Sequence, residues 1–261
     1  MSAALYVGDN VEVLRRVVSD DSIQLTVTSP PYDNLRKYNG YAWDFEAVAR
    51  ELYRVTKPGG VVVWVVADAT VNGSETGTSF RQVLCFRDVC GFNLHDTMIW
   101  NKGSAASAGS LAVRYVPVFE YMFILSKGAP LVFNPIKDKP NKWHGKAKIH
   151  GNVRKPDGTM VPKAGAGREI PPFGQRLNIW DIPPERNSKA YGHPAMFSEP
   201  LARDHIFSWS NPGDTVLDPF VGSGTTGKMA VLNSRSFIGI DISPVYVDLA
   251  KGRIPGAEVL D

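Results

Sequence analysis

Short apolar segments alternate along the chain with segments whose apolar residues recur at helical spacing. The helical segments are expected to begin near Asn10, Phe45, Thr78, Glu199, Thr225 and Pro244. Seven short apolar segments predict β-strands: Ala3 to Val7, Ile23 to Thr28, Val61 to Val66, His95 to Trp100, Val118 to Leu125, Thr215 to Leu217 and Ser236 to Ile240. This alternation predicts an α/β fold built on one layered, mostly parallel sheet.

Two helices carry specific expectations. Asp44 is expected to cap the helix that starts at Phe45, and Lys57-Pro-Gly-Gly is expected to end it. In the helix that follows Thr78, four apolar side chains are expected to face the core, those of Phe80, Val83, Leu84 and Val89.

Composition supports a packed globular protein. Of the 261 residues, 43% are hydrophobic and 21% are charged, which excludes wholesale disorder. The longest apolar run, Val61 to Ala67, is far shorter than the roughly 20 residues that span a bilayer, so no membrane partner is expected. Cys85 and Cys90 are too few for a disulfide framework or a zinc site and are expected to be buried free thiols. His144 and His150 lack acidic companions, and no metal is expected.

Positive charge is concentrated in one stretch of the chain. From Lys137 to Lys189 there are 12 Lys or Arg residues and 5 Asp or Glu residues, a local net charge of +7. The whole chain carries only +3, so the remainder is net acidic. The basic stretch contains many Pro and Gly residues, with aromatic residues such as Trp143 and Trp180 between them. A solvated loop is one interpretation. Because a structureless loop of this length is unusual, we interpret it as an insertion that faces nucleic acid.

A glycine-rich loop follows the strand that ends near Leu217. Gly222, Gly224 and Gly227 fit the pattern G-x-G-x-x-G, and Asp241 ends the next strand, 19 residues after Gly222. Such glycines let a ligand approach the backbone, and the carboxylate can bind two ribose hydroxyls. A nucleoside-bearing cofactor is therefore expected. A tight strand-to-helix turn without a ligand and a dinucleotide dehydrogenase are the alternatives.

A second motif, Thr28-Ser-Pro-Pro-Tyr32, follows an apolar strand. Its two prolines make the turn stiff and leave carbonyl oxygens free to accept hydrogen bonds where open α/β sheets place their ligands. Together with the glycine loop, Asp241 and Gly192-His-Pro-Ala-Met-Phe-Ser-Glu-Pro200, this turn resembles the amino-methylating DNA methyltransferases. The motif order resembles their β subgroup, with the catalytic motif first, the recognition region next and the cofactor motif last.

The resemblance implies a Rossmann-like sheet of seven strands, one of them antiparallel, and S-adenosyl-L-methionine as the cofactor. Residues 1–130 are expected to form the catalytic part, 131–190 the target-recognition insertion, and 191–261 the cofactor-binding part. The catalytic residues implied are Ser29, Pro30, Pro31 and Tyr32. The cofactor-binding residues implied are Asp9, Pro194, Phe197, Asp218, Pro219, Phe220, Gly222, Ser223, Gly224, Thr225, Thr226, Asp241 and Ile242. The expected DNA-binding residues are Arg36, Lys37, Tyr38, Lys142, Lys146, Lys148 and Arg154.

The chemistry implied suits these residue types. An exocyclic amine is a poor nucleophile because its lone pair is delocalised into the base ring. Hydrogen bonds from the amine to the Ser29 hydroxyl and the Pro30 carbonyl are expected to localise that lone pair. Tyr32 is expected to stack on a base that has left the duplex. No metal and no covalent nucleophile is required.

Ser29 at the first position of the turn favours cytosine N4 as the target, with adenine N6 as the alternative. Remoter alternatives are methylation of RNA or of protein glutamine, and a DNA-binding module without catalysis. The resemblance also implies double-stranded DNA as partner, a possible homodimer, a link to restriction–modification, and a cytoplasmic, nucleoid-associated enzyme of a prokaryote or phage.

Overall fold

A computed structural model describes residues 2–31, 43–103, 113–185 and 197–261. The chain forms two compact units: Met1–Asn134 together with Asn178–Asp261, and Pro135–Leu177. Within the described ranges, no helix is both long enough and apolar enough to cross a membrane.

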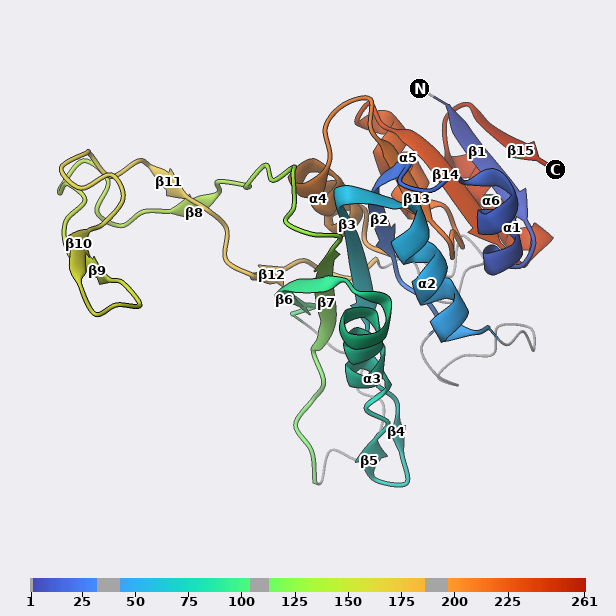
Figure 1. Cartoon of the computed structure of the whole chain (residues 1–261), viewed down its shortest axis with the longest axis horizontal. Coiled ribbons are helices and arrows are strands. Elements are labelled where there is room, and N and C mark those ends of the chain that lie inside the picture. Colours follow the sequence, from blue (N-terminus) through green and yellow to red (C-terminus); the bar gives the residue numbers. More distant parts are fainter. Residues whose placement is uncertain (1, 32–42, 104–112, 186–196) are drawn as a thin grey trace. The chain divides into compact units, whose positions relative to one another are not determined.

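The larger unit is built on one nine-stranded sheet with the order β12-β6-β7-β3-β2-β13-β14-β1-β15 (Figure 1). Strand β7 runs antiparallel to both of its neighbours, β3 and β6, and the other pairs in the sheet are parallel. The strands span β1 Ala3–Val7, β2 Ile23–Thr28, β3 Thr56–Val66, β6 Asn93–Asn101, β7 Phe119–Ser126, β12 Ile179–Asp181, β13 Thr215–Asp218, β14 Ser236–Asp241 and β15 Ala257–Leu260.

Helices connect most of the parallel strands. They span α1 Asn10–Val17, α2 Phe45–Val55, α3 Thr78–Cys85, α4 Glu199–Trp209, α5 Thr225–Leu232 and α6 Pro244–Arg253. A π-helical turn, η1 Phe86–Cys90, continues α3, and a small hairpin, β4 Thr70–Val71 with β5 Ser74–Glu75, precedes it. Asp44 caps α2 as expected, because its carboxylate accepts a hydrogen bond from the Ala47 N–H.

The seven expected strands and the single antiparallel strand are confirmed, and the α/β class with them. The count of seven is nevertheless too low. Two short strands, β12 and β15, extend the sheet at its two edges. They have only three and four residues, too short for a hydrophobic period to reveal them.

The helix after Thr78 forms where it is expected, but the expected inward face is wrong. Val83 is buried, whereas Phe80, Leu84 and Val89 are 48%, 45% and 49% exposed. The buried face instead carries Ser79, Gln82, Val83 and Phe86. Two polar side chains fix this orientation. The buried Trp64 indole donates to Gln82, and Ser79 bonds to the Asp68 carboxylate that follows β3. Hydrogen bonds to buried polar groups therefore decided the rotation of the helix.

The smaller unit consists of short antiparallel pairs and has no buried residue. Strand β8 (Lys139–Pro140) pairs with β11 (Phe173–Gly174), and β9 (Asn152–Arg154) pairs with β10 (Met160–Pro162). An ion pair between Arg176 and Asp138 joins its two ends. The unit lies inside the range 131–190 assigned to the insertion, whereas β12, also inside that range, pairs with β6 in the larger unit.

Candidate active site

The carboxyl ends of β2 and β13 lie next to each other in the sheet of the larger unit, and a ligand crevice is expected there. These neighbouring parallel strands pair through Val216 with Leu25 and Leu217 with Thr26. The chain leaves β13 through α5 toward β14 on one side, and it leaves β2 through α2 toward β3 on the other. Open α/β sheets bind ligands where the connections diverge in this way. The first residues of both sequence motifs therefore meet at this crevice.

The Ser-Pro-Pro turn leaves the carboxyl end of β2. Thr28, its last strand residue, is completely buried, and Pro30 is also buried, whereas Ser29 and Pro31 are half-buried. This burial fixes the start of the turn and leaves Ser29 partly exposed. Four other expected residues, Tyr32, Arg36, Lys37 and Tyr38, lie outside the described residues.

The glycine loop starts at Asp218, whose carboxylate is buried. Its Oδ1 atom accepts a hydrogen bond of 2.7 Å from the Thr28 hydroxyl and one of 3.1 Å from the Phe220 N–H. Burial raises the pKa of Asp218 to about 6, although these hydrogen bonds act in the opposite direction. Above this pH the ionised carboxylate is a cost to the folded state, which the hydrogen bonds partly offset.

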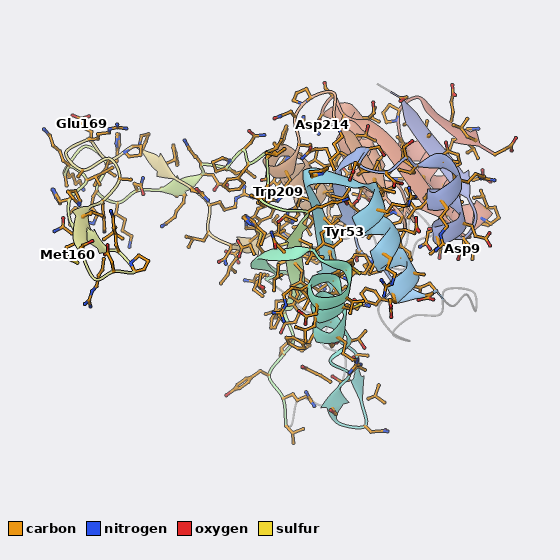
Figure 2. The ribbon with its side chains drawn as sticks, viewed as in Figure 1. Asp9, Tyr53, Met160, Glu169, Trp209 and Asp214 are labelled. Carbon is orange, nitrogen blue, oxygen red and sulfur yellow. The ribbon has the colours of Figure 1, made fainter. Side chains whose placement is uncertain are left out.

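Two other acids lie at the carboxyl ends of adjacent strands, β14 and β1. Asp241 pairs with Val7 in the register of these strands. Its Oδ2 accepts from the Gly222 N–H and its Oδ1 from the Ser243 N–H, at 3.0 Å and 2.9 Å. Burial raises the pKa of this carboxyl group as well. Asp9 caps α1, with Oδ1 accepting from two backbone N–H groups of the first turn (Figure 2). Both acids are thus held in place by backbone donors.

The three glycines of the loop have different structural roles. Gly222 and Gly224 have positive φ angles of 47° and 79°, which favour glycine. A Cβ atom on Gly224 would lie 2.9 Å from the Cα of Ala250 in α6, and one on Gly227 would lie 2.5 Å from Ile254 and Phe237 side chains. Gly222 therefore serves the turn, Gly227 serves helix packing, and Gly224 serves both.

Five further expected cofactor residues belong to the glycine loop or to the start of α5: Pro219, Phe220, Ser223, Thr225 and Thr226. Pro219, Ser223, Thr225 and Thr226 are buried, Phe220 is half-buried, and Ile242 is 37% exposed. Phe197 is half-buried and contacts the Trp100 ring, with 6.2 Å between ring centroids. Pro194 lies outside the described residues. The structure thus gathers the glycine-loop residues with Asp9 and Asp241, while their contacts with a cofactor remain predictions.

Arg253 at the end of α6 supports the glycine loop and was missed in the sequence. It donates to the Ser223 carbonyl at 2.5 Å and to the Glu199 carboxylate at 3.2 Å. Lys228 of α5 donates to the same carboxylate oxygen at 2.7 Å. This ion pair network ties α4, α5 and α6 to the loop. A basic residue in the last turn of a helix is common, so the sequence carried no distinctive signal for it.

Trp43 is a second residue that sequence reasoning missed. Its ring packs edge-on against Phe220 of the glycine loop, with 4.9 Å between ring centroids, and it also contacts Trp64. Trp43 immediately precedes the Asp44 cap of α2. An aromatic residue just before a helix is expected to pack against other apolar side chains, but the sequence does not show which ones.

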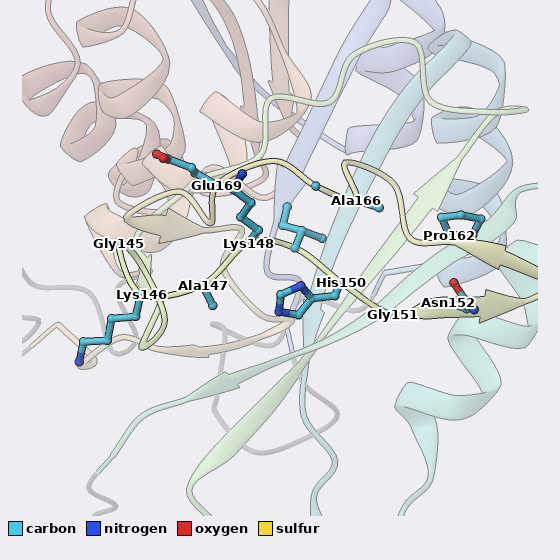
Figure 3. A pocket seen from close by; sticks show the side chains of 12 residues that line it. Gly145, Lys146, Ala147, Lys148, His150, Gly151, Asn152, Pro162, Ala166 and Glu169 are labelled. Carbon is cyan, nitrogen blue, oxygen red and sulfur yellow. The ribbon is translucent and has the colours of Figure 1, made fainter.

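The smaller unit carries the expected DNA-binding residues Lys142, Lys146, Lys148 and Arg154, all exposed. Its 43 residues hold ten Lys or Arg against three Asp or Glu. A surface hollow of about 660 Å³ is lined by Lys146, Lys148, His150, Asn152 and Glu169, among others. Figure 3 shows Lys148 and Glu169 close together, with Lys146 pointing away from them (Figure 3). The unit therefore presents a hydrogen-bonded framework with a strong positive charge.

The two cysteines are half-buried free thiols, less buried than expected. Burial raises the pKa of Cys90 to about 11, which keeps this thiol protonated at neutral pH. Among the residues that the structure describes, no group of three His, Cys, Asp or Glu is placed to share a metal ion.

Comparison with known proteins decides the family. The family model N6_N4_Mtase, described as DNA methylase, matches residues 23–252. The chain belongs to this family. M.BamHII, an orphan methyltransferase of Bacillus amyloliquefaciens, is 53% identical over 253 residues, covering 95% of this chain and 94% of that protein. The chain is therefore a DNA methyltransferase of the amino-methylating kind.

Two solved structures share the fold of this DNA methylase. The PvuII DNA methyltransferase, described as cytosine-N4-specific, matches with a TM-score of 0.70 and 23% identity, covering 97% of this chain and 86% of that one. TTHA0409, a putative DNA modification methylase of Thermus thermophilus solved with S-adenosyl-L-methionine, matches with a TM-score of 0.64 and 27% identity. That match covers 99% of this chain and 100% of the other. The arrangement of the sheet around the crevice is thus that of DNA methyltransferases.

Proposed function

We propose that this DNA methylase transfers a methyl group from S-adenosyl-L-methionine to the exocyclic N4 amino group of cytosine in double-stranded DNA. The family includes enzymes for both N4 and N6 targets, so the target base must come from the site. The observation that carries the cytosine proposal is Ser29 at the first position of the Pro-Pro turn, on the carboxyl end of β2. It brings a hydroxyl-bearing residue to the strand ends where both motifs meet.

The residues at the crevice fit S-adenosyl-L-methionine. Gly222 and Gly224 hold the loop in a tight turn with positive φ angles, as expected for a turn that binds a nucleoside-bearing cofactor. Asp241 and Asp9, which lie at the ends of adjacent strands, are proposed to bind the ribose hydroxyls and the adenine amino group respectively. The 27% identical TTHA0409, solved with this cofactor, supports the assignment. When bound, the cofactor supplies an electrophilic methyl group.

The chain's own contribution is orientation. The Ser29 hydroxyl and the Pro30 carbonyl accept hydrogen bonds from the target amine, which localises its lone pair. Because the methyl donor is already reactive, correct placement of the amine supplies most of the remaining rate acceleration. The target base must leave the duplex to reach the crevice. Tyr32, outside the described residues, is proposed to stack on it.

Sequencing of DNA methylated by the enzyme, with detection of modified bases, tests the function directly. We expect N4-methylcytosine at one short recognition sequence. N6-methyladenine at a defined sequence would establish the alternative target. DNA that stays unmodified with the cofactor bound would instead favour a DNA-binding module without catalysis.

The cofactor role of Asp241 gives a binding prediction. In Asp241→Ala, loss of a charged hydrogen-bonding partner should weaken S-adenosyl-L-methionine binding by about one to two orders of magnitude. Isothermal titration calorimetry measures this, and circular dichroism verifies that the variant is folded. Asp248→Ala, at an exposed position in α6, is the matched control and should leave the affinity unchanged. An unaltered Kd in folded Asp241→Ala would remove Asp241 from the ribose site.

The positive charge of the smaller unit gives a second prediction. Changing Lys142, Lys146 and Lys148 to Gln should weaken DNA binding and make it less dependent on salt. Each lost phosphate contact lowers the slope of log K against log salt by about 0.9. Fluorescence anisotropy at several salt concentrations measures the slope.

A matched control keeps this test specific. Lys251 is an exposed cation in α6 of the larger unit, and Lys251→Gln should keep the wild-type slope. If the triple variant also keeps that slope, the smaller unit does not contact the DNA backbone.

We also propose that the enzyme forms a homodimer. The exposed apolar side chains Phe80, Leu84 and Val89 on α3 and η1 support this proposal. A two-fold dimer needs only one self-complementary surface, which two copies of an apolar helix face can provide. Analytical ultracentrifugation of the wild type and of Leu84→Glu tests it, and a wild type that sediments as a monomer at high concentration would exclude it.

A further inference from the structure

Thr28 and Asp218 form a buried hydrogen bond that joins the two loops of the crevice. Thr28 is the last residue of β2 and directly precedes Ser29, while Asp218 is the last residue of β13 and opens the glycine loop. The distance between the Thr28 hydroxyl and Asp218 Oδ1 is 2.7 Å. Thr28 is fully buried and Asp218 is 5% exposed. Water therefore cannot readily replace either partner.

A second side-chain hydrogen bond joins β2 to the segment that follows β13, with the donor on the other side. The Thr226 hydroxyl at the start of α5 donates to the Val27 carbonyl of β2 at 3.2 Å. The register between β2 and β13 ends at Leu217 and Thr26. Beyond this point the pairing between β2 and β13 ends. The two side-chain hydrogen bonds then connect β2 to the start of the glycine loop and to the start of α5.

We propose that Thr28 is a positioning residue for methyl transfer, because its hydrogen bond to Asp218 sets the Ser29-Pro30 turn relative to the glycine loop. The inference rests on the proposed function, since it assigns the target amine to the turn and the methyl donor to the loop. A change in the distance between the turn and the glycine loop therefore changes the distance between the target amine and the methyl group. A displacement of about 1 Å is enough to lower a rate about 100-fold.

The local environment argues that this contact is more than a generic packing interaction. A hydroxyl two residues earlier on the same strand, that of Thr26, is just as buried and has no hydrogen-bond partner among the described residues. The strand therefore tolerates a buried threonine without a partner. Burial of the Asp218 carboxylate is costly, and its hydrogen bonds from Thr28 and Phe220 offset that cost.

The test compares three variants of the full chain in three assays. Thr28→Val removes the hydroxyl with little change in shape, Thr28→Ser keeps a hydroxyl, and Thr26→Val makes the same substitution where no hydrogen bond is lost. Single-turnover rates use cognate duplex DNA, the affinity for S-adenosyl-L-methionine uses calorimetry, and melting temperatures verify the fold. Should Thr28→Val fail to fold, Thr28→Ala replaces it in the same comparison.

We expect Thr28→Val to lower the single-turnover rate about tenfold or more, while its affinity for S-adenosyl-L-methionine stays within about threefold. Thr28→Ser should recover most of the rate, and Thr26→Val should keep the wild-type rate. A folded Thr28→Val with the wild-type rate would overturn the proposal. So would a loss of rate in Thr28→Val that is matched by an equal loss in Thr26→Val, which would indicate general destabilisation. If the wild type itself leaves DNA unmethylated, the proposed function fails, and the positioning role fails with it.

Discussion

Ser29→Ala is expected to lower the rate of methyl transfer about 100-fold while leaving S-adenosyl-L-methionine binding within about twofold. The hydroxyl is proposed to hold the target amine, and loss of correct orientation has effects of this size. The cofactor contacts are assigned to other residues, those of the glycine loop and Asp241. Single-turnover kinetics on cognate duplex DNA measures the rate, and calorimetry measures the affinity.

Two controls sharpen this prediction. Ser74→Ala, in the exposed β4–β5 hairpin, should keep the wild-type rate. Placing the target cytosine opposite a mismatch lowers the cost of extruding it. Because the proposed defect of Ser29→Ala lies in orientation, the mismatch should restore little of its rate. Full activity of Ser29→Ala would exclude a role for the Ser29 hydroxyl. Complete rescue of Ser29→Ala by the mismatch would indicate that the hydroxyl acts in base extrusion instead.

Gly224→Ala is expected to lower the free energy of unfolding by about 2–5 kcal/mol. The positive φ angle of 79° costs an alanine about 1–2 kcal/mol. The added Cβ would also lie 2.9 Å from the Cα of Ala250, and crowding of this kind costs about 1–3 kcal/mol. For a chain of this size we expect the melting temperature to fall by about 5–15 °C. S-adenosyl-L-methionine should also bind more weakly, because the loop must move away from α6.

Gly252→Ala is the matched control in α6. A Cβ atom on Gly252 would meet no heavy atom within 4 Å, and its backbone is helical. Alanine is favoured over glycine in helices, so this variant should melt at the wild-type temperature or slightly above it. Equal melting temperatures for Gly224→Ala and Gly252→Ala would show that α6 does not confine the glycine loop.

The strands were predictable because their sequences are dominated by apolar and β-branched residues. All residues of β2 are buried, as are Val61 to Val66 of β3, and such continuous runs are typical of central parallel strands. The rotation of α3 was not predictable from the same rule. Its apolar residues suggested one face, whereas the hydrogen bonds of Gln82 and Ser79 with distant partners selected another.

Some residues of the candidate site were likewise predictable from the sequence, and others were not. Ser29 and the three glycines could be found because short motifs carry them, and the glycine loop lies where the motif indicates. Thr28 was part of the motif but was given no role, since its bond to Asp218 joins residues 190 positions apart. Arg253 could not be found, because its role depends on how α6 packs against the loop. A single sequence records such contacts only indirectly.

The position of β1 in the sheet has a consequence for the order of folding. The two partners of this strand, β14 and β15, follow it by more than 200 residues along the chain and are therefore synthesised much later. Strands β2, β3, β6 and β7 can pair with one another much earlier on the ribosome. Until β14 has been synthesised, β1 therefore has neither of its neighbours and exposes unpaired backbone groups to other nascent chains. Depletion of chaperones during synthesis should accordingly affect the half of the sheet around β1 before the half that carries the Ser-Pro-Pro turn.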